Sequence, residues 1–296
     1  MDNSFSKIFK QKLHEVLKAF DLFCNNNNLN YYACSGTAIG AVRHHDIIPW
    51  DDDVDVFMPR SDYDKFLELR QTLKETNYGV KCLGDCDYIY GFAKFYDKRT
   101  TLIELEIFPS CLLGVYIDVF PLDFVSSSID DLQEKMFEYR KKYRRFQFTY
   151  YKPTIRNTIG NIIHFRVVNI WDIITCCLCS KKQKEKIRRD FIAFDKKWRE
   201  DEGEYLICHV GKYPIEKELM KKEWFVSYQY VPFGDERIRI NNNCDDYLKH
   251  LWGDYMKCPP IKLQKSHHYH YYINFKEGLT LKQVENRIKN GEYLVM

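Results

Sequence analysis

The sequence lacks several features that mark common classes of protein. It contains no internal repeat and no low-complexity linker, which predicts one continuous unit. Its first residues, MDNSFSKIFKQKLHEVL, have no apolar signal core. The most apolar window, residues 159–178, is interrupted by His164, Arg166 and Asp172, so we do not expect it to span a membrane. We expect a buried core helix there, with a helix resting on a membrane surface as the alternative.

The net charge and the cysteine pattern indicate which partners and which redox compartment to expect. The net charge is only +3, and no glycine-rich or aromatic–basic RNA motif accompanies the basic runs at residues 140–145 and 181–189. Nucleic acid is therefore not an expected partner. Such runs are typical of solvated helix faces, with an acidic membrane surface or a polyanionic ligand as alternatives. The 11 cysteines do not form two pairs at zinc-finger spacing, and we expect free thiols in a reducing cytosol.

One short stretch of the sequence is strongly acidic and is flanked by apolar residues on both sides. Its four carboxylates are Asp51, Asp52, Asp53 and Asp55. In an extended strand, Asp51, Asp53 and Asp55 would share one face, with Asp52 on the other. Carboxylates on one face repel one another unless a cation or another partner neutralises them. Because oxygen ligands suit hard divalent ions, the stretch predicts a Mg²⁺ or Mn²⁺ site for phosphate chemistry.

Two other segments fit the same chemistry. Gly36 and Thr37 follow a predicted strand and open a predicted helix, where backbone N–H groups and a hydroxyl could hold a phosphate. Arg43 adds a fixed positive charge to this segment. Asp118 lies between apolar residues in a further predicted strand, which makes it a candidate third carboxylate.

The hydrophobic pattern predicts an α+β protein with a mixed sheet flanked by helices. We expect a catalytic core in residues 1–125 and a mostly helical region in residues 126–296 that binds substrate and packs on the core. Predicted helices span residues 5–24, 38–44, 61–76, 245–252 and 282–290, with two or three more in 129–200. Predicted strands span residues 29–34, 54–58, 80–83, 88–95, 101–108, 114–120, 224–231 and 237–240.

Taken together, these segments resemble the nucleotidyltransferase fold and, more narrowly, the LicD family, bacterial phosphocholine transferases related to fukutin-type ribitol-phosphate transferases. The resemblance rests on GTAIGAVRHHDIIPWDDDVDVFMPRSDYDKF (36–66), AKFYDKRTTL (93–102) and YIDVFPLD (116–123). It extends to YLKHLWGDYMKCPP (247–260) and the histidine cluster that follows. The family often has glycine where this chain has His45. Residues 125–240 show only faint similarity, so the resemblance does not carry over a choice of substrate.

The resemblance implies transfer of a phospho-alcohol group from a CDP-activated donor, such as CDP-choline, to a hydroxyl of a cell-surface glycan or its lipid-linked precursor, with release of CMP. Asp53 and Asp55 would bind Mg²⁺ or Mn²⁺. Asp118 would bind a second ion or take the proton of the acceptor, and Asp51 is the other candidate base. The acceptor implies a cytoplasmic protein with peripheral membrane contact.

The resemblance also suggests donor and acceptor contacts. Gly36 and Thr37 would hold donor phosphate, and Arg43 and Lys94 would stabilise charge on the transferred group. The weaker candidates from the same matched segments are Asp97 and Thr101, and the acceptor or phosphate contacts are His267 and His268.

Two other functions stay open. The chain could transfer a nucleotidyl group, placing NMP on a protein, an RNA or a small molecule. It could also be a non-catalytic binding protein of the same fold, which is disfavoured because all three carboxylate positions are present. Within the LicD-type interpretation, phosphoethanolamine, aminoethylphosphonate, ribitol phosphate and glycerol phosphate are alternatives to phosphocholine.

Overall fold

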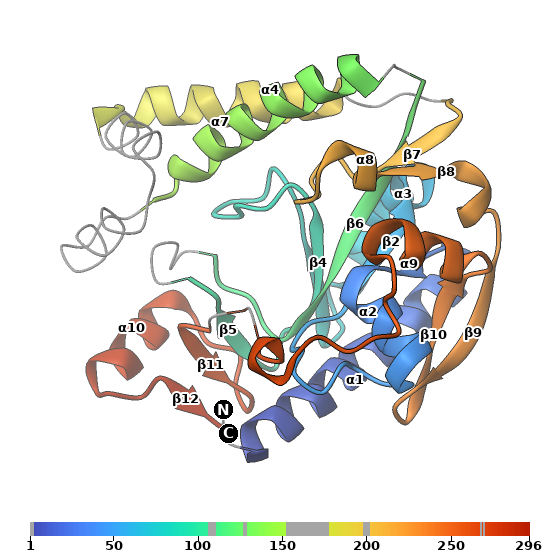
Figure 1. Cartoon of the computed structure of the whole chain (residues 1–296). Coiled ribbons are helices and arrows are strands. Elements are labelled where there is room, and N and C mark those ends of the chain that lie inside the picture. Colours follow the sequence, from blue (N-terminus) through green and yellow to red (C-terminus); the bar gives the residue numbers. More distant parts are fainter. Residues whose placement is uncertain are drawn as a thin grey trace.

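The computed structural model describes residues 3–105, 111–126, 129–151, 178–197, 202–266, 268 and 270–296. His267 and most of the apolar window at 159–178 therefore lie outside the described residues. Figure 1 shows a central sheet with helices packed around it.

The central sheet is mixed, which confirms the predicted α+β class. Its main strands are β1 (Tyr32–Ala33), β2 (Asp55–Pro59), β3 (Tyr78–Lys81), β4 (Ala93–Asp97) and β6 (Tyr116–Val125), in the order β1-β2-β6-β4-β3. β2 and β6 are parallel, and the other pairs in this order are antiparallel. The long strand β6 therefore lies at the centre, between β2 and β4.

One face of the sheet forms the hydrophobic core against helix α1 (Asn3–Asn26) and helix α3 (Arg60–Leu69), which continues as a 3-10 turn, η2 (Arg70–Leu73). The ring of Phe20 in α1 lies 5.8 Å from that of Phe66 in α3 and 5.5 Å from that of Phe95 in β4. Successive residues of a strand point to opposite faces. Lys94 and its cross-strand partner Asp118 therefore lie on the other face of the sheet.

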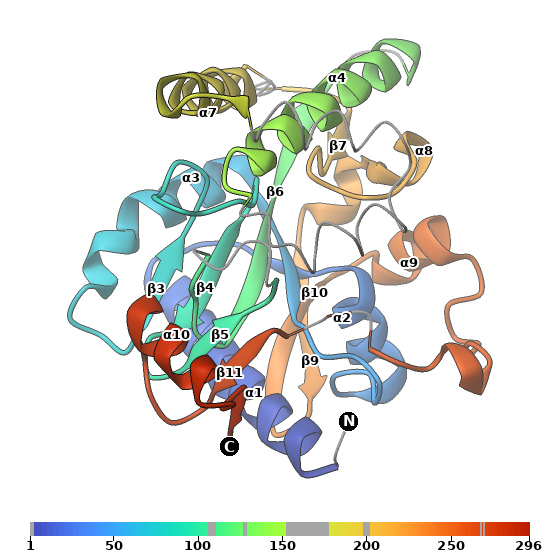
Figure 2. The ribbon, with the colours of Figure 1, turned by 90° about the vertical axis from the view of Figure 1, so that its left-hand side faces the viewer.

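The rest of the chain surrounds this core. Helices α4 (Ile129–Phe148) and α7 (Lys181–Lys196) lie side by side, as Figure 2 also shows, and α8 (Ile215–Glu218) packs near α4. Strands β7 (Tyr205–Ile207) and β8 (Leu219–Lys221) extend the sheet from the end of β6. After the 3-10 turn η3 (Lys222–Phe225), β9 (Tyr228–Phe233) and β10 (Glu236–Asn241) form a hairpin, followed by α9 (Cys244–Trp252) and η4 (Ile261–Leu263).

A small three-stranded sheet holds the C-terminus against the core. It contains β5 (Thr101–Ile103), β11 (Tyr272–Asn274) and β12 (Leu294–Val295), with α10 (Leu281–Lys289) between the last two. Helix α10 begins at a capping box in which Thr280 and Gln283 each bond the other's backbone N–H. Within the described part of the chain, no helix combines the length and hydrophobicity needed to cross a membrane.

A buried ionic network ties the sheet to the α4–α7 pair. Asp123 of β6 accepts two bonds from the Arg60 guanidinium, at 2.5 and 2.8 Å, and lies 2.5 Å from His209 Nδ1. His209 Nε2 is 3.2 Å from Asp195 of α7, which also accepts a 2.8 Å bond from the Tyr139 hydroxyl of α4. Burial alone would lower the pKa of His209, but Asp123 and Asp195 raise it to about 9. The network thus pairs two cations with two carboxylates.

Most predicted elements are confirmed, with shifted ends. The helix expected at residues 38–44 is a short α-helix, α2 (Ser35–Ile39), that runs into a π-helical turn, η1 (Gly40–His44). The strand expected to begin at residue 224 begins at Tyr228, because residues 222–225 form a 3-10 turn instead. Strands β7, β8, β11 and β12 were not expected. Each has only two or three residues, too few for a period-two pattern to be recognised.

Candidate active site

The parallel pairing of β2 and β6 brings two of the predicted carboxylates together. Asp55 stands directly opposite Asp118 in the register, and the Asp118 N–H donates to Val54 O at 2.9 Å. Neighbouring strands lie about 4.8 Å apart, and paired residues point to the same face, so the two side chains are close neighbours. β2 begins only at Asp55, so Asp51 to Asp53 lie in the segment that leads into the strand and not within it.

Asp53, Asp55 and Asp118 repel one another in a site that is only partly open to water. Burial raises the pKa of Asp55 well above its ordinary value, with added repulsion from Asp53 and Asp118. Burial and the neighbouring Asp51 raise the pKa of Asp53 to about 8. A cation placed among these oxygens would remove the repulsion and restore the charged forms. The donor set is all oxygen and strongly acidic, and it therefore fits a hard divalent ion such as Mg²⁺ or Mn²⁺.

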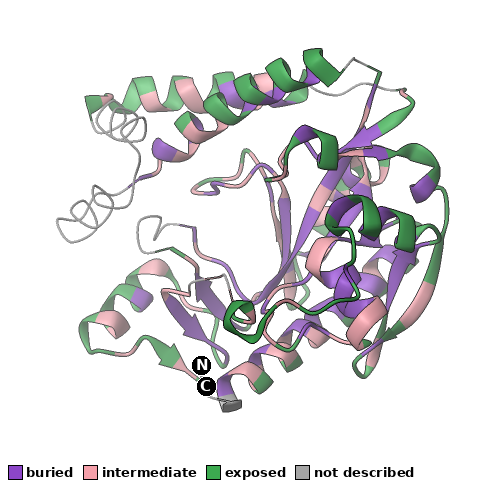
Figure 3. Ribbon diagram, viewed as in Figure 1, coloured by how far each residue is buried: buried purple, intermediate pink, exposed green. Residues whose placement is uncertain are grey.

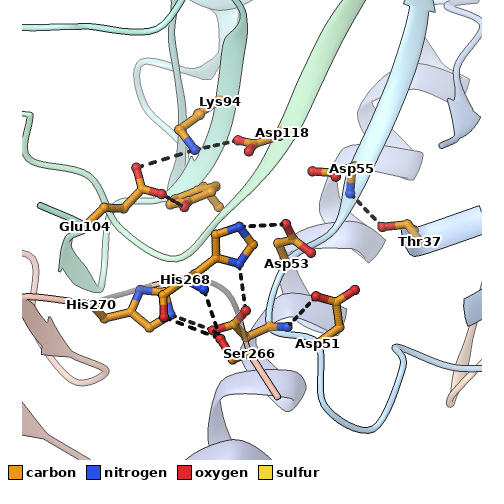
Figure 4. Close-up of polar contacts among 12 residues, drawn as sticks. Thr37, Asp51, Asp53, Asp55, Lys94, Glu104, Asp118, Ser266, His268 and His270 are labelled. Atoms are coloured by element: carbon orange, nitrogen blue, oxygen red, sulfur yellow. Dashed lines mark hydrogen bonds and ion pairs between the residues drawn. The ribbon is translucent and has the colours of Figure 1, made fainter. Parts of the chain in front are cut away.

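Figure 4 shows Ser266, His268 and His270 of the C-terminal segment beside the acidic cluster, and Asp52 bonds all three. Asp52 is buried and accepts hydrogen bonds from Ser266 Oγ at 2.7 Å, His268 Nδ1 at 2.8 Å and His270 Nε2 at 3.1 Å. Although burial opposes the shift, these bonds hold the pKa of Asp52 well below its usual range. Ser266 and His270 are contacts that sequence reasoning missed. The histidine cluster signalled them, but nothing in the sequence said which carboxylate it meets.

His268 joins Asp52 to the rest of the acidic cluster. Its Nε2 lies 3.4 Å from Asp53 Oδ2, while its Nδ1 bonds Asp52. The hydrogen bond that His268 donates to Asp52 raises the pKa of His268 to about 9. Asp51, Asp52 and His268 also bring ligand atoms within 4.8 Å of one another. Because both ring nitrogens of His268 already face carboxylates, an ion pair explains this trio. Asp53, Asp55 and Asp118 stay the predicted metal ligands.

Lys94 is the cation that faces Asp118. It is 1% exposed, and its Nζ lies 2.6 Å from Asp118 Oδ1 and 3.7 Å from Glu104 Oε2. Burial opposes its charge, but the two carboxylates raise the pKa of Lys94. The Nζ also lies 3.5 Å from the ring centroid of Tyr116 and 4.6 Å from that of Tyr90. These contacts keep the ammonium charged and fix one oxygen of Asp118.

Glu104 completes this arrangement and was missed by sequence reasoning. It accepts hydrogen bonds from the hydroxyls of Tyr90 and Tyr116, the same two rings that contact Lys94. Burial opposes the charged form of Glu104, yet Lys94 and the two hydroxyls lower its pKa. Only its place in the predicted strand at 101–108 drew attention to this segment, and no motif marked Glu104 itself.

Gly36 and Thr37 lie beside the carboxylates, as the sequence predicted. The Thr37 hydroxyl accepts a 2.8 Å bond from the Asp55 N–H, so it helps to fix the start of β2. A Cβ on Gly36 would lie 2.7 Å from Asp51 Oδ2. Glycine at this position therefore lets the Asp51 carboxylate approach the backbone closely.

The structure does not bring the remaining donor-binding candidates to the cluster. Arg43 donates from Nη1 to the carbonyl oxygens of Tyr255 and Lys257, so it anchors the C-terminal segment. Asp97 accepts from the Arg99 guanidinium at 2.9 and 2.7 Å within a turn.

Thr101 and His45 also have structural roles. Thr101 Oγ1 donates to Glu277 O at 2.7 Å and accepts from Leu279 N at 2.8 Å, which secures the C-terminal segment. His45 has a φ of 55°, in the left-handed region that favours glycine. This conformation gives a physical reason why a glycine suits this position.

Known proteins match this chain over the acidic cluster and over most of its length. Residues 28–162 match the model of the LicD/FKTN/FKRP nucleotidyltransferase domain. The chain is similar to the lipopolysaccharide cholinephosphotransferase LicD of Haemophilus influenzae, with 29% identity over 258 residues, or 86% of this chain and 92% of that protein. An uncharacterized protein of Rickettsia typhi is 29% identical over 157 residues, 51% of this chain and 44% of its own length. Another, of Rickettsia prowazekii, is 34% identical over 68 residues, 23% and 26% of the two chains.

Proposed function

Because the chain carries a LicD-family domain over residues 28–162, we propose that it transfers a phospho-alcohol group, phosphocholine or a close analogue, from a CDP-activated donor to a hydroxyl of a cell-surface glycan or its lipid-linked precursor. CMP is the second product. The similar protein of Haemophilus influenzae is named as a lipopolysaccharide cholinephosphotransferase, which supports this choice of cargo and acceptor. A lipid-linked acceptor places the protein in the cytoplasm with peripheral contact to the membrane.

The observation that carries the proposal is the set of mutually repelling carboxylates Asp53, Asp55 and Asp118, which lie on two parallel strands and on the segment that leads into β2. These residues would hold Mg²⁺ or Mn²⁺, which when bound supplies positive charge to a diphosphate donor. Lys94 holds Asp118 through its Oδ1 atom. Gly36 and Thr37 lie in the adjoining helix α2, and the donor phosphates would lie beside them.

In the proposed reaction, the acceptor hydroxyl oxygen forms a bond to the phosphorus that carries the alcohol. The bond from that phosphorus to the bridging oxygen breaks, and CMP leaves with the electron pair. The hydroxyl proton passes to a carboxylate base. We assign this role to Asp51, because burial and the neighbouring Asp52 raise the pKa of Asp51, whereas Asp118 is already bound to Lys94.

Substituting Gly36 tests the role of Asp51. In Gly36→Ala, the new methyl group displaces the flexible Asp51 carboxylate, which lies 2.7 Å away, and leaves the backbone unchanged. If Asp51 is the base, we expect kcat to fall by about 10²–10⁴-fold, as it should in Asp51→Asn, with an unchanged melting temperature. A role of Gly36 in holding donor phosphate would raise KM for the donor instead. If Asp51→Asn keeps full kcat, the assignment is wrong and Asp118 becomes the candidate base.

A panel of CDP-alcohols tests the function itself. The purified protein is incubated with CDP-choline, CDP-ethanolamine, CDP-ribitol or CDP-glycerol and Mn²⁺, and CMP release by hydrolysis is measured. We expect one donor to be turned over well above the others, with chelation of the metal abolishing release.

The same assay separates the competing functions. Pyrophosphate release from a nucleoside triphosphate, with NMP attached to a second substrate, would favour nucleotidyl transfer. Binding of a CDP-alcohol without turnover of any donor or triphosphate would favour a non-catalytic protein.

A further inference from the structure

The α4–α7 pair presents a concentration of positive charge at one of its ends. The helices are antiparallel, because Tyr139 of α4 meets Asp195 of α7 while Thr149, just after α4, meets Arg188. The C-terminal part of α4 and the N-terminal part of α7 therefore lie together (Figures 1 and 2). We call residues 140–151 and 180–190 at this end the basic tip.

The basic tip holds more positive charge than the whole protein. Its two segments contain eleven Lys and Arg residues and only two acidic residues. Since the complete chain has a net charge of +3, the rest of the molecule is net negative. An excess of positive charge is thus concentrated at one end of one helix pair.

Contacts within the protein neutralise only part of this positive charge. Lys186 pairs with Asp190 at 2.6 Å, and Arg188 donates to Thr149 and covers the Tyr150 ring. Arg140 donates to the carbonyl oxygens of Gly211 and Tyr213, and Lys142 pairs with Glu138 at 2.8 Å. Figure 3 colours much of this helix surface as exposed. The exposed cations of the tip include Lys141, Lys181, Lys182 and Arg189.

Apolar side chains lie exposed beside these cations. Leu178 is 80% exposed just before α7, and Phe137 is 72% exposed one turn before Lys141. By contrast, the other rings of the pair pack between the helices, with Phe146 and Phe191 stacked at 4.8 Å. Exposed cations beside single apolar residues are typical of helices that rest on anionic lipid surfaces. Nucleic acid binding would instead favour several exposed rings for base stacking.

We propose that the basic tip docks the protein on an anionic lipid surface. The choice of a membrane rests on the proposed function, because a lipid-linked acceptor is anchored at a bilayer. Docking would hold the acidic active site near such acceptors. The attraction is electrostatic, so it should weaken as salt shortens the Debye length below about 10 Å.

Vesicle cosedimentation of the full chain tests this proposal. We expect binding to vesicles of phosphatidylcholine with phosphatidylglycerol, and little binding to phosphatidylcholine alone. Each cation near the surface contributes about 1 kcal/mol, which is about fivefold in partitioning. Changing Lys141, Lys181, Lys182 and Arg189 together to Gln should therefore reduce binding by about 10²-fold or more.

A matched variant controls for total charge. The quadruple change of Lys74, Lys262, Lys282 and Lys289 to Gln removes the same charge from exposed positions outside the tip and should leave binding near wild type. Equal loss in both variants, binding to neutral vesicles alone, or tighter binding to an RNA oligonucleotide than to anionic vesicles would each overturn the proposal. CMP release from a soluble CDP-alcohol, measured without vesicles, should be the same in all three proteins. Failure of that assay in the wild type would refute the proposed function and leave the docking result intact.

Discussion

Asp55→Asn should abolish metal-dependent turnover while making the metal-free protein no less stable. Asp55 is half-buried opposite Asp118 and repels Asp53 and Asp118, so its negative charge costs stability until a cation binds. The neutral amide removes that repulsion but cannot replace a charged metal ligand. We expect CMP release to fall by at least about 10³-fold, a loss on the scale of removing a main source of transition-state charge stabilisation.

The response of the melting temperature to Mg²⁺ shows whether the lost activity comes from lost metal binding. Mg²⁺ should raise the melting temperature of the wild type, by mass action, and raise that of Asp55→Asn much less. Asp53→Asn should behave in the same way. As a control, Asp235→Asn changes an exposed carboxylate in the β9–β10 turn and should leave both activity and the Mg²⁺ response unchanged. A folded Asp55→Asn protein with wild-type turnover would show that Asp55 does not bind a metal needed for the reaction.

Asp123→Ala should cause the largest loss of stability among single substitutions in the described core. Asp123 is fully buried and is the partner of both Arg60 and His209. Its removal leaves a guanidinium and an imidazolium buried with one carboxylate fewer to pair them. Breaking a buried ion pair in this way costs about 3–5 kcal/mol, a large part of the total stability of a typical domain.

The pH dependence identifies the cause of that loss. Asp123 and Asp195 raise the pKa of His209 to about 9, from 6.5 in an unfolded chain. A group whose pKa rises on folding stabilises the protein fully below its unfolded pKa, so this contribution should be lost between about pH 6.5 and 9. Urea unfolding should show the decline in the wild type and a smaller one in Asp123→Ala. An equal decline in both proteins, or a loss below about 1 kcal/mol, would contradict this account.

Some of the predicted site residues lie close together in the sequence, and others come from distant segments. Gly36, Thr37, Asp53 and Asp55 lie within one strand–turn–helix–strand unit, where short-range patterns decide which side chains meet. The structure places these residues together. Asp118 joins them because β2 and β6 pair in parallel, and sequence periodicity fixes neither this pairing nor its register.

Other contacts depend on segments far apart in the chain. Asp52 was expected to face away from the other carboxylates, and it meets Ser266 and His270 more than 200 residues later. Arg43 was expected at the donor and instead bonds backbone carbonyls near Tyr255. The Arg43 guanidinium could bond either a donor phosphate or backbone carbonyls, and only the path of the folded chain decides between these partners.

The sequence by itself determined the α+β class, the main helices, the acidic cluster and the family resemblance. These depend on periodicity and on charges placed close together, and both are visible in a linear string. The tertiary structure alone decided that Lys94 is buried against Asp118 and Glu104, that histidines hold Asp52, and that two basic runs meet at one end of a helix pair. Each of these requires long-range packing, and residue order does not specify which distant groups come together once water is excluded.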